Sequence, residues 1–371
     1  MDAQFRHALL SRPSADEQGR ESFIAAMRRF LVTELYSGNE VAYKSRQLPA
    51  FVRQNGRQPN NYHEVKRVMQ GDPFYRAFSL LNRATQELLW DTVGESIERQ
   101  LPDLKAAAQG VTPAGGSLTI DPDFDLPEYA RKVDIHVMPG SFHTALAEED
   151  IYAGAMYDRG VYLYAYGGLG PQNAGLGEAT ANFVRERFPD LAPKRILDMG
   201  CGTGMSSQPL AEAWPDAEIH AVDIAEPMLR YAHGRSEAMG VPIHYHLASA
   251  AKTPFEAGSF DLVVSTIMLH EMPQKLSRQV VIECHRLLRP GGVMVHNDLV
   301  GWPTDPFLEF MAEWNAHHNN EVFERGSGTL DWRGACDAAG FDDADVFLQP
   351  VDAAYMTEQL AYIGFRGAVR N

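Results

Sequence analysis

Apolar residues in the N-terminal part of the chain recur at helical spacing. One such stripe is made of Phe23, Met27, Phe30, Leu31 and Leu35. A second, longer amphipathic helix should begin at Asp72 and Pro73 and continue to about residue 101, because Asp caps helix N-termini and Pro is tolerated in the first turn. The N-terminal part is therefore predicted to be mainly helical.

Further along the chain, short apolar runs alternate with helix-compatible segments. Such alternation is typical of an α/β domain with a parallel sheet. The expected strands cover residues 196–197, 218–222, 259–265, 293–296, 344–348 and 361–369, with another beginning near residue 244. The expected helices cover residues 206–214, 225–232, 283–288, 306–317 and 331–339.

A break at residues 109–116, rich in Gly, Pro and Thr, predicts a linker between the two parts. Short strands are expected after it at 117–120 and 133–137. A tyrosine-rich helix should follow at 148–166, although Gly154 and Gly160 weaken that prediction. A last helix, 177–188, should lead into the α/β domain.

The composition excludes several classes of function. The formal net charge is −16 and no basic run is present, which disfavours nucleic acid and anionic membranes, since clustered Lys and Arg bind phosphates. No stretch approaches a transmembrane span, and the N-terminus lacks the apolar core of a signal peptide. Cys201, Cys284 and Cys336 are scattered, so we expect free thiols in a cytoplasmic protein.

The most informative motif is RILDMGCGTG at residues 195–204, where a buried strand runs into a glycine turn that opens a helix. Gly200, Gly202 and Gly204 let the backbone approach a ligand where a β-carbon would collide. The free N–H groups at such a helix start face nucleotide-like ligands. Dinucleotide-binding turns need a third glycine where this chain has Met205, so the pattern is D-x-G-x-G-x-G instead.

This pattern resembles the first motif of the class I S-adenosylmethionine (SAM)-dependent methyltransferases. Further motifs follow in that family's order: Asp223 at the tip of the second strand, TPF at 253–255, SFDLVVS at 259–265 and RPGG at 289–292. The resemblance implies a Rossmann-like α/β core of seven strands. It also implies SAM as cofactor and S-adenosylhomocysteine as product.

The resemblance further implies which residues hold the cofactor. They are Asp198, Gly200, Gly202, Gly204, Asp223, Ile224, Ser249, Ala250 and Thr266. Asp223 is placed to accept hydrogen bonds from ribose hydroxyls, and it could equally cap the helix that follows. Ser249 stands where many relatives have an acidic residue for the adenine amino group, and its hydroxyl accepts that bond more weakly.

The best candidate for a general base is His270, because it follows the fourth strand, whose carboxyl end faces the ligand crevice. Its segment resembles the (L/C)-H-(D/N)-W motif of plant-type O-methyltransferases, in which the histidine is the base. Glu271 takes the acidic place of that motif, and Met272 replaces the tryptophan. His270 could instead pack beneath the cofactor. Asp298 could orient His270 or the substrate, or only cap the turn before Gly301.

Tyr157, His136 and Trp314 are the candidate substrate contacts. Tyr157 and Tyr164 share one face of the tyrosine-rich helix, where packing in a core is the commoner role of aromatic residues. The tyrosines predicted on the other face are Tyr152, Tyr162 and Tyr166. Trp314 belongs to a helix where small-molecule methyltransferases often place a substrate lid; the alternative is a helix that only packs against the core through its apolar stripe. His136 and His143 alone do not make a metal site, so no metal is expected.

The layout as a whole resembles two-domain small-molecule methyltransferases, in which a helical N-terminal part covers the SAM domain and often mediates dimerisation. We therefore expect a helical cap or dimerisation region (1–116), a connecting segment that helps to cover the active site (117–170), a SAM domain (171–371) and a homodimer. The expected reaction moves a methyl group to an oxygen, nitrogen or sulfur atom of a small molecule, for example in secondary metabolism. The alternatives are a protein substrate and a non-catalytic SAM-binding partner.

Overall fold

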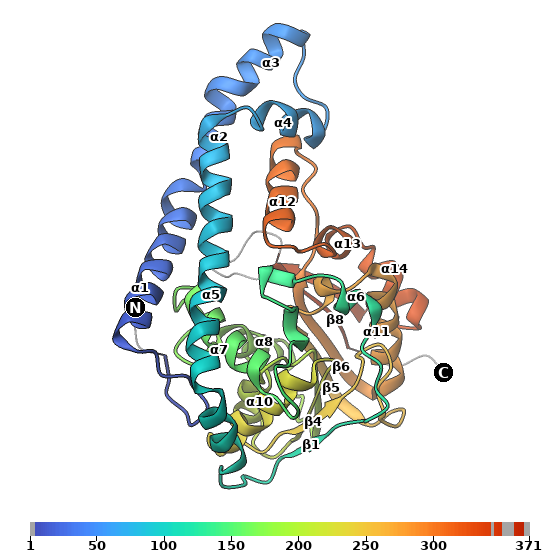
Figure 1. Ribbon diagram of the computed structural model, residues 1–371. Coiled ribbons are helices and arrows are strands. Elements are labelled where there is room, and N and C mark those ends of the chain that lie inside the picture. Colours follow the sequence, from blue (N-terminus) through green and yellow to red (C-terminus); the bar gives the residue numbers. More distant parts are fainter. Residues whose placement is uncertain (1–3, 343–344, 351–359, 367–371) are drawn as a thin grey trace.

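The computed structural model describes residues 4–342, 345–350 and 360–366, and its centre is a single sheet with helices packed around it (Figure 1). The strand order is β1-β4-β3-β2-β5-β6-β8-β7. Neighbouring strands are parallel, except that β8 is antiparallel to both β6 and β7. The strands are β1 (Ser117–Thr119), β2 (Arg195–Met199), β3 (Glu218–Asp223), β4 (His244–Leu247), β5 (Phe260–Thr266), β6 (Leu288–Leu299), β7 (Val346–Pro350) and β8 (Leu360–Arg366).

The Rossmann-like α/β core expected from the sequence is confirmed, and one extra strand extends it. β1 is the strand predicted at 117–120, and it pairs in parallel with the edge strand β4, with Leu118 opposite Tyr245. Among the described residues the sheet therefore has eight strands instead of seven. The strands predicted at 344–348 and 361–369 correspond to β7 and β8, and residues 344 and 367–369 lie outside the described residues.

Helices form the N-terminal part as predicted, and the longest of them, α5, runs from the region of α2 and α4 down past the sheet domain (Figure 1). The N-terminal elements are α1 (Ala15–Phe30), the π-helical turn η1 (Leu31–Leu35), α2 (Gly38–Ala42), the π-helical turn η2 (Tyr43–Gln47), α3 (Leu48–Asn55), α4 (Tyr62–Met69) and α5 (Pro73–Gln109). The carboxylate of Asp72 caps α5 through the backbone N–H groups of Phe74 and Tyr75, as the Asp-Pro pair predicted.

The remaining helices connect the strands or follow them. They are α6 (Glu128–Arg131), η3 (Ile135–Val137), η4 (Ser141–His143), α7 (Tyr152–Tyr164), α8 (Gly175–Arg187), α9 (Ser207–Ala213), α10 (Glu226–Ala238), η5 (Leu269–Glu271), α11 (Gln274–Leu287), α12 (Pro306–His318), α13 (Glu324–Gly328) and α14 (Trp332–Ala339). Helix α12 leaves the sheet domain and packs on the N-terminal helices through Phe310 and Trp314, beside Met69 of α4 and Phe78 of α5. Helix α12, which follows β6, thus connects the α/β domain to the N-terminal helices by packing contacts.

The strand predicted at 133–137 is wrong, because this segment forms the 3-10 turn η3. His136 has a φ of 54° and Val137 a φ of 62°, a conformation that no strand adopts. The carbonyl of His136 accepts hydrogen bonds from Gln86 Nε2 (2.6 Å) and Trp90 Nε1 (2.8 Å) on α5. Long-range contacts with α5 therefore override the local β-propensity of this apolar stretch.

The two glycines that weakened the prediction of α7 are explained by its close packing. A β-carbon at Gly160 would lie 2.2 Å from the ring of Trp90 on α5, and one at Gly154 would lie 2.3 Å from Cβ of Tyr231 on α10. Both distances are shorter than van der Waals contact. Helix α7 therefore pays the helix-propensity cost of two glycines in order to pack between α5 and α10.

Asp158 forms a buried polar centre where α7 meets α10 and the N-terminal segment. Its carboxylate accepts hydrogen bonds from Gln4 Nε2 (3.0 Å) and Tyr231 Oη (2.9 Å), and it lies 3.1 Å from His7 Nε2 and 3.3 Å from Arg235 Nε. Burial raises the pKa of Asp158, but His7, Arg235 and Tyr231 outweigh it and lower the pKa to about 2. The ionised carboxylate therefore holds these elements together.

We expect Asp158→Asn to reduce the free energy of unfolding by roughly 2 kcal/mol near neutral pH. Because the folded-state pKa lies below the unfolded value, this contribution is present above about pH 4 and is lost as the pH falls towards 2. The difference between the two proteins in urea denaturation should therefore shrink in acid. The exposed Asp103 supplies a control, Asp103→Asn, for which no such change is expected. A difference that did not vary with pH would contradict the role of the Asp158 charge.

Among the described residues, no helix combines the length and the apolar character needed to cross a membrane.

Candidate active site

The glycine loop after β2 has the backbone that the motif predicts, and its three glycines serve different purposes. Gly200, Gly202 and Gly204 have φ values of 70°, 51° and 77°, which L side chains adopt only at a cost. A β-carbon would lie 2.4 Å from the Met268 side chain at Gly200 and 2.4 Å from Tyr245 Oη at Gly204. At Gly202 the nearest atoms are 4.0 Å away. Protein packing requires the outer two glycines, whereas Gly202 faces open space.

Asp198 lies behind this loop and does not line the cavity in front of it. Its Oδ2 accepts hydrogen bonds from the hydroxyls of Ser206 (2.7 Å) and Ser207 (2.6 Å) at the start of α9. Burial raises the pKa of Asp198 to about 6. Gly204 also lies away from the cavity lining, so the structure separates these two from the other predicted cofactor residues.

Asp223 joins the end of β3 to the glycine loop. Its Oδ2 accepts a hydrogen bond from the backbone N–H of Gly202 (2.9 Å), and its Oδ1 accepts one from Ala225 (2.9 Å), just before α10. The second bond forms an Asx turn before the helix; the alternative that Asp223 caps α10 is wrong, because the N-cap residue is Ala225 and no side chain caps the helix. Because Asp223 also lines the cavity, the ribose-binding prediction and the turn-stabilising role are compatible.

The other predicted cofactor residues belong to the lining of the same cavity. Ile224, Ser249, Ala250 and Thr266 all line it. The Ser249 hydroxyl accepts a hydrogen bond from the backbone N–H of Ala251 (3.2 Å). The Oγ1 of Thr266 is buried with no hydrogen-bond partner among the described residues. The strand ends thus supply a wall with one hydroxyl that has no protein partner.

The cavity is large, and both parts of the chain build it. Its volume is about 1220 Å³, more than the roughly 300–1,000 Å³ typical of a site for one drug-sized ligand. The glycine loop and the ends of β3 and β5 form one side, and α1, α5, α7 and α12 contribute the other through residues such as Arg28, Trp90, Tyr157 and Trp314. The cavity therefore has room for two small molecules side by side.

His270 lines this cavity and forms a buried pair with Asp298. The Nδ1 of His270 lies 2.7 Å from Asp298 Oδ1, which fixes Nδ1 as the donor, since a carboxylate accepts. The other carboxylate oxygen accepts the backbone N–H groups of Met268 (2.9 Å) and Leu269 (2.6 Å). Asp298 therefore orients His270, as one reading of the sequence predicted, and Nε2 of His270 lies 3.7 Å from Glu271 Oε1.

Charge around His270 strengthens its affinity for a proton. Burial lowers the pKa of His270, but the carboxylates of Asp298 and Glu271 outweigh it and raise the pKa well above its ordinary value. Asp298 has its pKa lowered by the same pairing, against the effect of burial. With this raised pKa, His270 keeps its proton to a higher pH than a free imidazole, so it can accept a proton from an acceptor only in its unprotonated fraction, which grows with pH.

Comparison with known proteins agrees with this geometry. Residues 196–292 match the profile of a methyltransferase domain family. The malonyl-[acyl-carrier protein] O-methyltransferase of Methylococcus capsulatus is 35% identical over 224 residues, which are 57% of this chain and 76% of that protein. The chain belongs to the class I SAM-dependent methyltransferases.

Other matches are shorter or more distant. The demethylmenaquinone methyltransferase of Thermus thermophilus is 37% identical over 115 residues, or 30% of this chain and 51% of that protein. The chain spans only about half to three-fifths of the length of the first curated relatives that it matches, at 61% and 51%. A solved O-methyltransferase-like structure from Nostoc punctiforme is 19% identical and superposes with a TM-score of 0.43, covering 60% of this chain and 64% of the other.

The cavity of this class I methyltransferase fits SAM. The space in front of Gly202 is open, and a β-carbon at this position would enter it. Thr266 Oγ1 has no hydrogen-bond partner among the described residues. The carboxylate of Asp223 lies beside that space, because it accepts the backbone N–H of Gly202. Gly202, Asp223 and the wall formed by Ser249 and Thr266 are therefore the residues that would hold SAM.

The cavity lining near His270 contains an acidic cluster, Glu271, Glu321 and Glu324, that the sequence only partly indicated. Burial raises the pKa of Glu271 to about 7 and of Glu324 to about 7, and it raises the pKa of Glu321 well above its ordinary value. Burial, with the charges of His270 and Arg28, lowers the pKa of His136 to about 3. Glu321 and Glu324 were missed, and the only signal for them was two acidic residues directly after the predicted lid helix.

All three predicted substrate contacts line the cavity: Tyr157, His136 and Trp314. Trp314 also packs, since its indole N–H donates to Ser79 Oγ (2.8 Å). The tyrosines divide largely as the helical period predicted, because Tyr164 lines the cavity as well while Tyr152 and Tyr162 lie in the core beside α5. Tyr166 is the exception: it lies beyond the end of α7 with a φ of 42° and lines the cavity.

We expect Asp223→Ala to weaken SAM binding by roughly 1–3 kcal/mol, the usual loss when a charge-assisted hydrogen bond is left unmade. Calorimetric titration of SAM measures this loss, and circular dichroism checks the fold, since Asp223 also supports Gly202 and Ala225. Affinity within error of the wild type, in a folded variant, would leave Asp223 with the turn-stabilising role alone.

Proposed function

We propose that this protein transfers the methyl group of SAM to an oxygen or nitrogen atom of a small molecule. The observation that carries the proposal is the continuous cavity, which joins the glycine loop at Gly202 to the His270–Asp298 pair beneath the N-terminal helices. A roof over the cavity excludes water and strengthens the polar contacts that orient an acceptor.

When bound, SAM supplies a methyl group on a positively charged sulfur, which leaves as neutral thioether after transfer. The chain's own residues must align the acceptor and remove its proton. Nε2 of His270 faces the acidic end of the cavity, because Nδ1 is bonded to Asp298. His270 is therefore placed to take the proton from the acceptor, and Asp298 to stabilise the imidazolium that results. Methyl transfer to a thioether sulfur would need no such base, because this sulfur carries no proton.

Transfer of labelled methyl groups tests the proposal. The protein is incubated with methyl-labelled SAM and, separately, with a small-molecule extract and a protein extract of the source cells. Label in the small-molecule fraction, with an equal amount of S-adenosylhomocysteine, is the expected result. Label in proteins would favour the protein-methyltransferase alternative. SAM binding without transfer in either extract would favour a non-catalytic partner.

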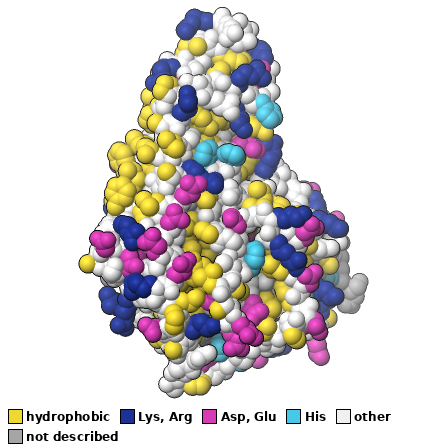
Figure 2. All heavy atoms as spheres, in the orientation of Figure 1, with side chains coloured by type: hydrophobic (Ala, Val, Ile, Leu, Met, Phe, Trp, Pro, Cys, Tyr) yellow, Lys and Arg dark blue, Asp and Glu magenta, His cyan; other side chains and the backbone are white. Residues whose placement is uncertain are grey.

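A homodimer, a cytoplasmic location and a role in secondary metabolism stay predictions. The N-terminal helices expose apolar side chains, and Figure 2 shows such side chains gathered along this part of the molecule. They include Phe23, Phe30, Val32, Leu80, Leu81 and Leu88. Phe23 and Phe30 belong to the apolar stripe that recurs at helical spacing and are exposed here, so a second copy packed on them would cover that stripe. The molar mass from light scattering tests this.

A further inference from the structure

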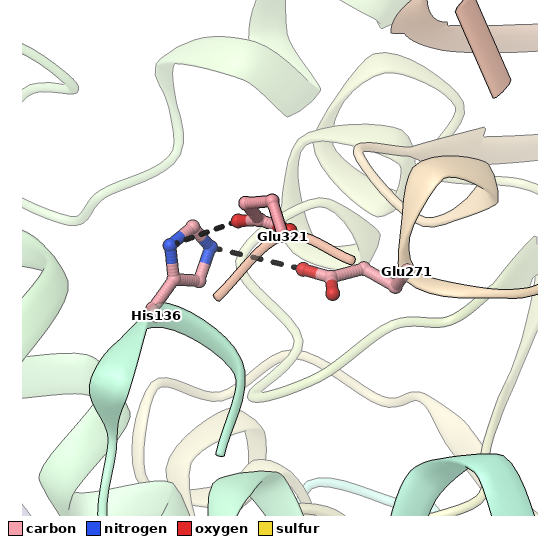
Figure 3. Close-up of side chains that lie close together, drawn as sticks. All are labelled: His136, Glu271 and Glu321. Carbon is pink, nitrogen blue, oxygen red and sulfur yellow. Dashed lines mark ion pairs between the residues drawn. The ribbon is translucent and has the colours of Figure 1, made fainter. Parts of the chain in front are cut away.

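Three side chains from distant segments of the chain lie close together (Figure 3). All three line the cavity, and one of them, Glu271, lies 3.7 Å from Nε2 of His270. His136 comes from η3, Glu271 from η5, and Glu321 from the segment between α12 and α13. Nδ1 of His136 lies 3.0 Å from Glu321 Oε1, and Nε2 of His136 lies 3.7 Å from Glu271 Oε1. One nitrogen or oxygen atom from each of the three residues lies within 4.8 Å of the others.

Among the described residues, the carboxylates of this cluster have one cationic neighbour, His270, whose Nε2 lies 3.7 Å from Glu271 Oε1, and neither carboxylate is paired with a Lys or Arg. Glu321 is only 5% exposed, and its Oε2 has no hydrogen-bond partner among the described residues; the same holds for Oε2 of Glu271. Arg28 is the only Lys or Arg among the described residues that line the cavity, and its guanidinium stacks on Tyr164 instead (3.8 Å to the ring centre). Burying carboxylates is costly unless they are paired or coordinate a metal.

We propose that His136, Glu271 and Glu321 bind one divalent transition-metal ion. One imidazole and two carboxylates suit Zn²⁺ or Mn²⁺, whereas Mg²⁺ and Ca²⁺ prefer oxygen ligands alone. Three protein ligands leave further coordination positions for water or an oxygen atom of the acceptor, as in open catalytic sites. His136 binds through one ring nitrogen, and the cluster accounts for the two unpartnered carboxylate oxygens.

This site was not expected, because His136 and His143 alone did not suggest one. The structure supplies the missing ligands from residues 271 and 321, while His143 is not part of the group. The proposal does not rest on methyl transfer. Its test therefore uses binding of the metal alone, so that failure of the proposed function and failure of the metal site can be told apart.

The experiment titrates Zn²⁺, and separately Mn²⁺, into the full chain without an affinity tag after removal of metals by a chelator. Calorimetry follows Zn²⁺, and the electron paramagnetic resonance signal of free Mn²⁺ follows Mn²⁺. We expect one ion per chain in the wild type. Loss of an outer-shell group already weakens metal binding by about 10–100-fold, so His136→Ala and Glu321→Gln should weaken it at least about tenfold.

Two control variants show whether uptake occurs in this cluster. Glu324→Gln removes a neighbouring carboxylate that is not a proposed ligand. His246→Ala removes a histidine that lies 3.1 Å from His220, on β4 and β3 outside the cavity, where Zn²⁺ could also bind. Both controls should keep the wild-type affinity of the tight site. Circular dichroism confirms the fold, and Glu321→Gln, which keeps the side-chain shape, decides the question if His136→Ala does not fold.

Three results would overturn the proposal. The first is no saturable uptake of either metal by the wild type. The second is equal affinity in the wild type, His136→Ala and Glu321→Gln. The third is a result in thermal unfolding: tetramethylammonium chloride stabilises the wild type but not Glu321→Gln, while neither metal stabilises the wild type. The cluster would then be a site for an organic ammonium group.

Discussion

Replacing Gly202 by valine should abolish measurable SAM binding while leaving the fold intact. A β-carbon at this position would lie 4.0 Å from its nearest neighbours, Tyr157 and Met228, which is no closer than ordinary van der Waals contact. The valine side chain would occupy the space before the loop where the backbone must approach a ligand. Calorimetric titration of SAM, with circular dichroism of the variant, measures the effect.

The control must separate a blocked ligand path from backbone strain, because Gly202 has a φ of 51°. Gly258 provides it, since its φ is 65°, a β-carbon there would meet nothing within 4 Å, and it lies away from the cavity. Gly258→Val should bear a similar strain, about 1–3 kcal/mol, and keep its affinity for SAM. Unchanged affinity in a folded Gly202→Val variant would contradict the proposed position of the cofactor.

The parts of the molecule that were predictable are those whose signal is local in the chain. The glycine turn, the strands around it and the cap of α5 depend on residues within a few positions of one another, and all of them are found. Asp223 and His270 were placed correctly on the cavity because parallel strands bring their carboxyl ends to one edge of a sheet. A family motif and elementary topology were sufficient for this half of the site.

The parts that were not predictable depend on contacts between distant segments. Whether residues 133–137 form a strand was decided by Gln86 and Trp90 on α5, which bond the carbonyl of His136. Gly154 and Gly160 looked unfavourable because glycine has a low helix propensity. The packing that explains them is against Tyr231 and Trp90, which lie far away in the sequence. No spacing rule relates such residues before the fold is known.

The acidic end of the cavity shows the same limit for function. Glu321 is 185 positions from His136 along the chain, yet their side chains lie 3.0 Å apart. The sequence could rank His270 as a base, because its motif is contiguous, but it could not show that His136 has carboxylates on both sides. The N-terminal helices therefore do more than cover the SAM domain, since their contacts set the position of His136.

Replacing His270 by alanine should lower turnover by roughly 10²–10⁴-fold and leave SAM affinity nearly unchanged, which is the usual effect of removing a general base. His270 is 2% exposed and bonded to Asp298. The substitution therefore removes the imidazole that Asp298 orients. Asp298→Asn should also lower turnover, because the amide no longer stabilises the imidazolium that forms. Single-turnover assays with saturating SAM isolate the methyl-transfer step from binding.

His143→Ala is the matched control, since His143 is a second histidine on the cavity wall without a carboxylate partner among the described residues. It should retain most of the turnover, because no buried aspartate orients it towards the acceptor. Equal losses in the two alanine variants would indicate that His270 acts only by shaping the cavity. Turnover that survives His270→Ala would exclude the base role altogether. The acceptor would then be a thioether, or a group already deprotonated before it binds, because neither has a proton for His270 to remove.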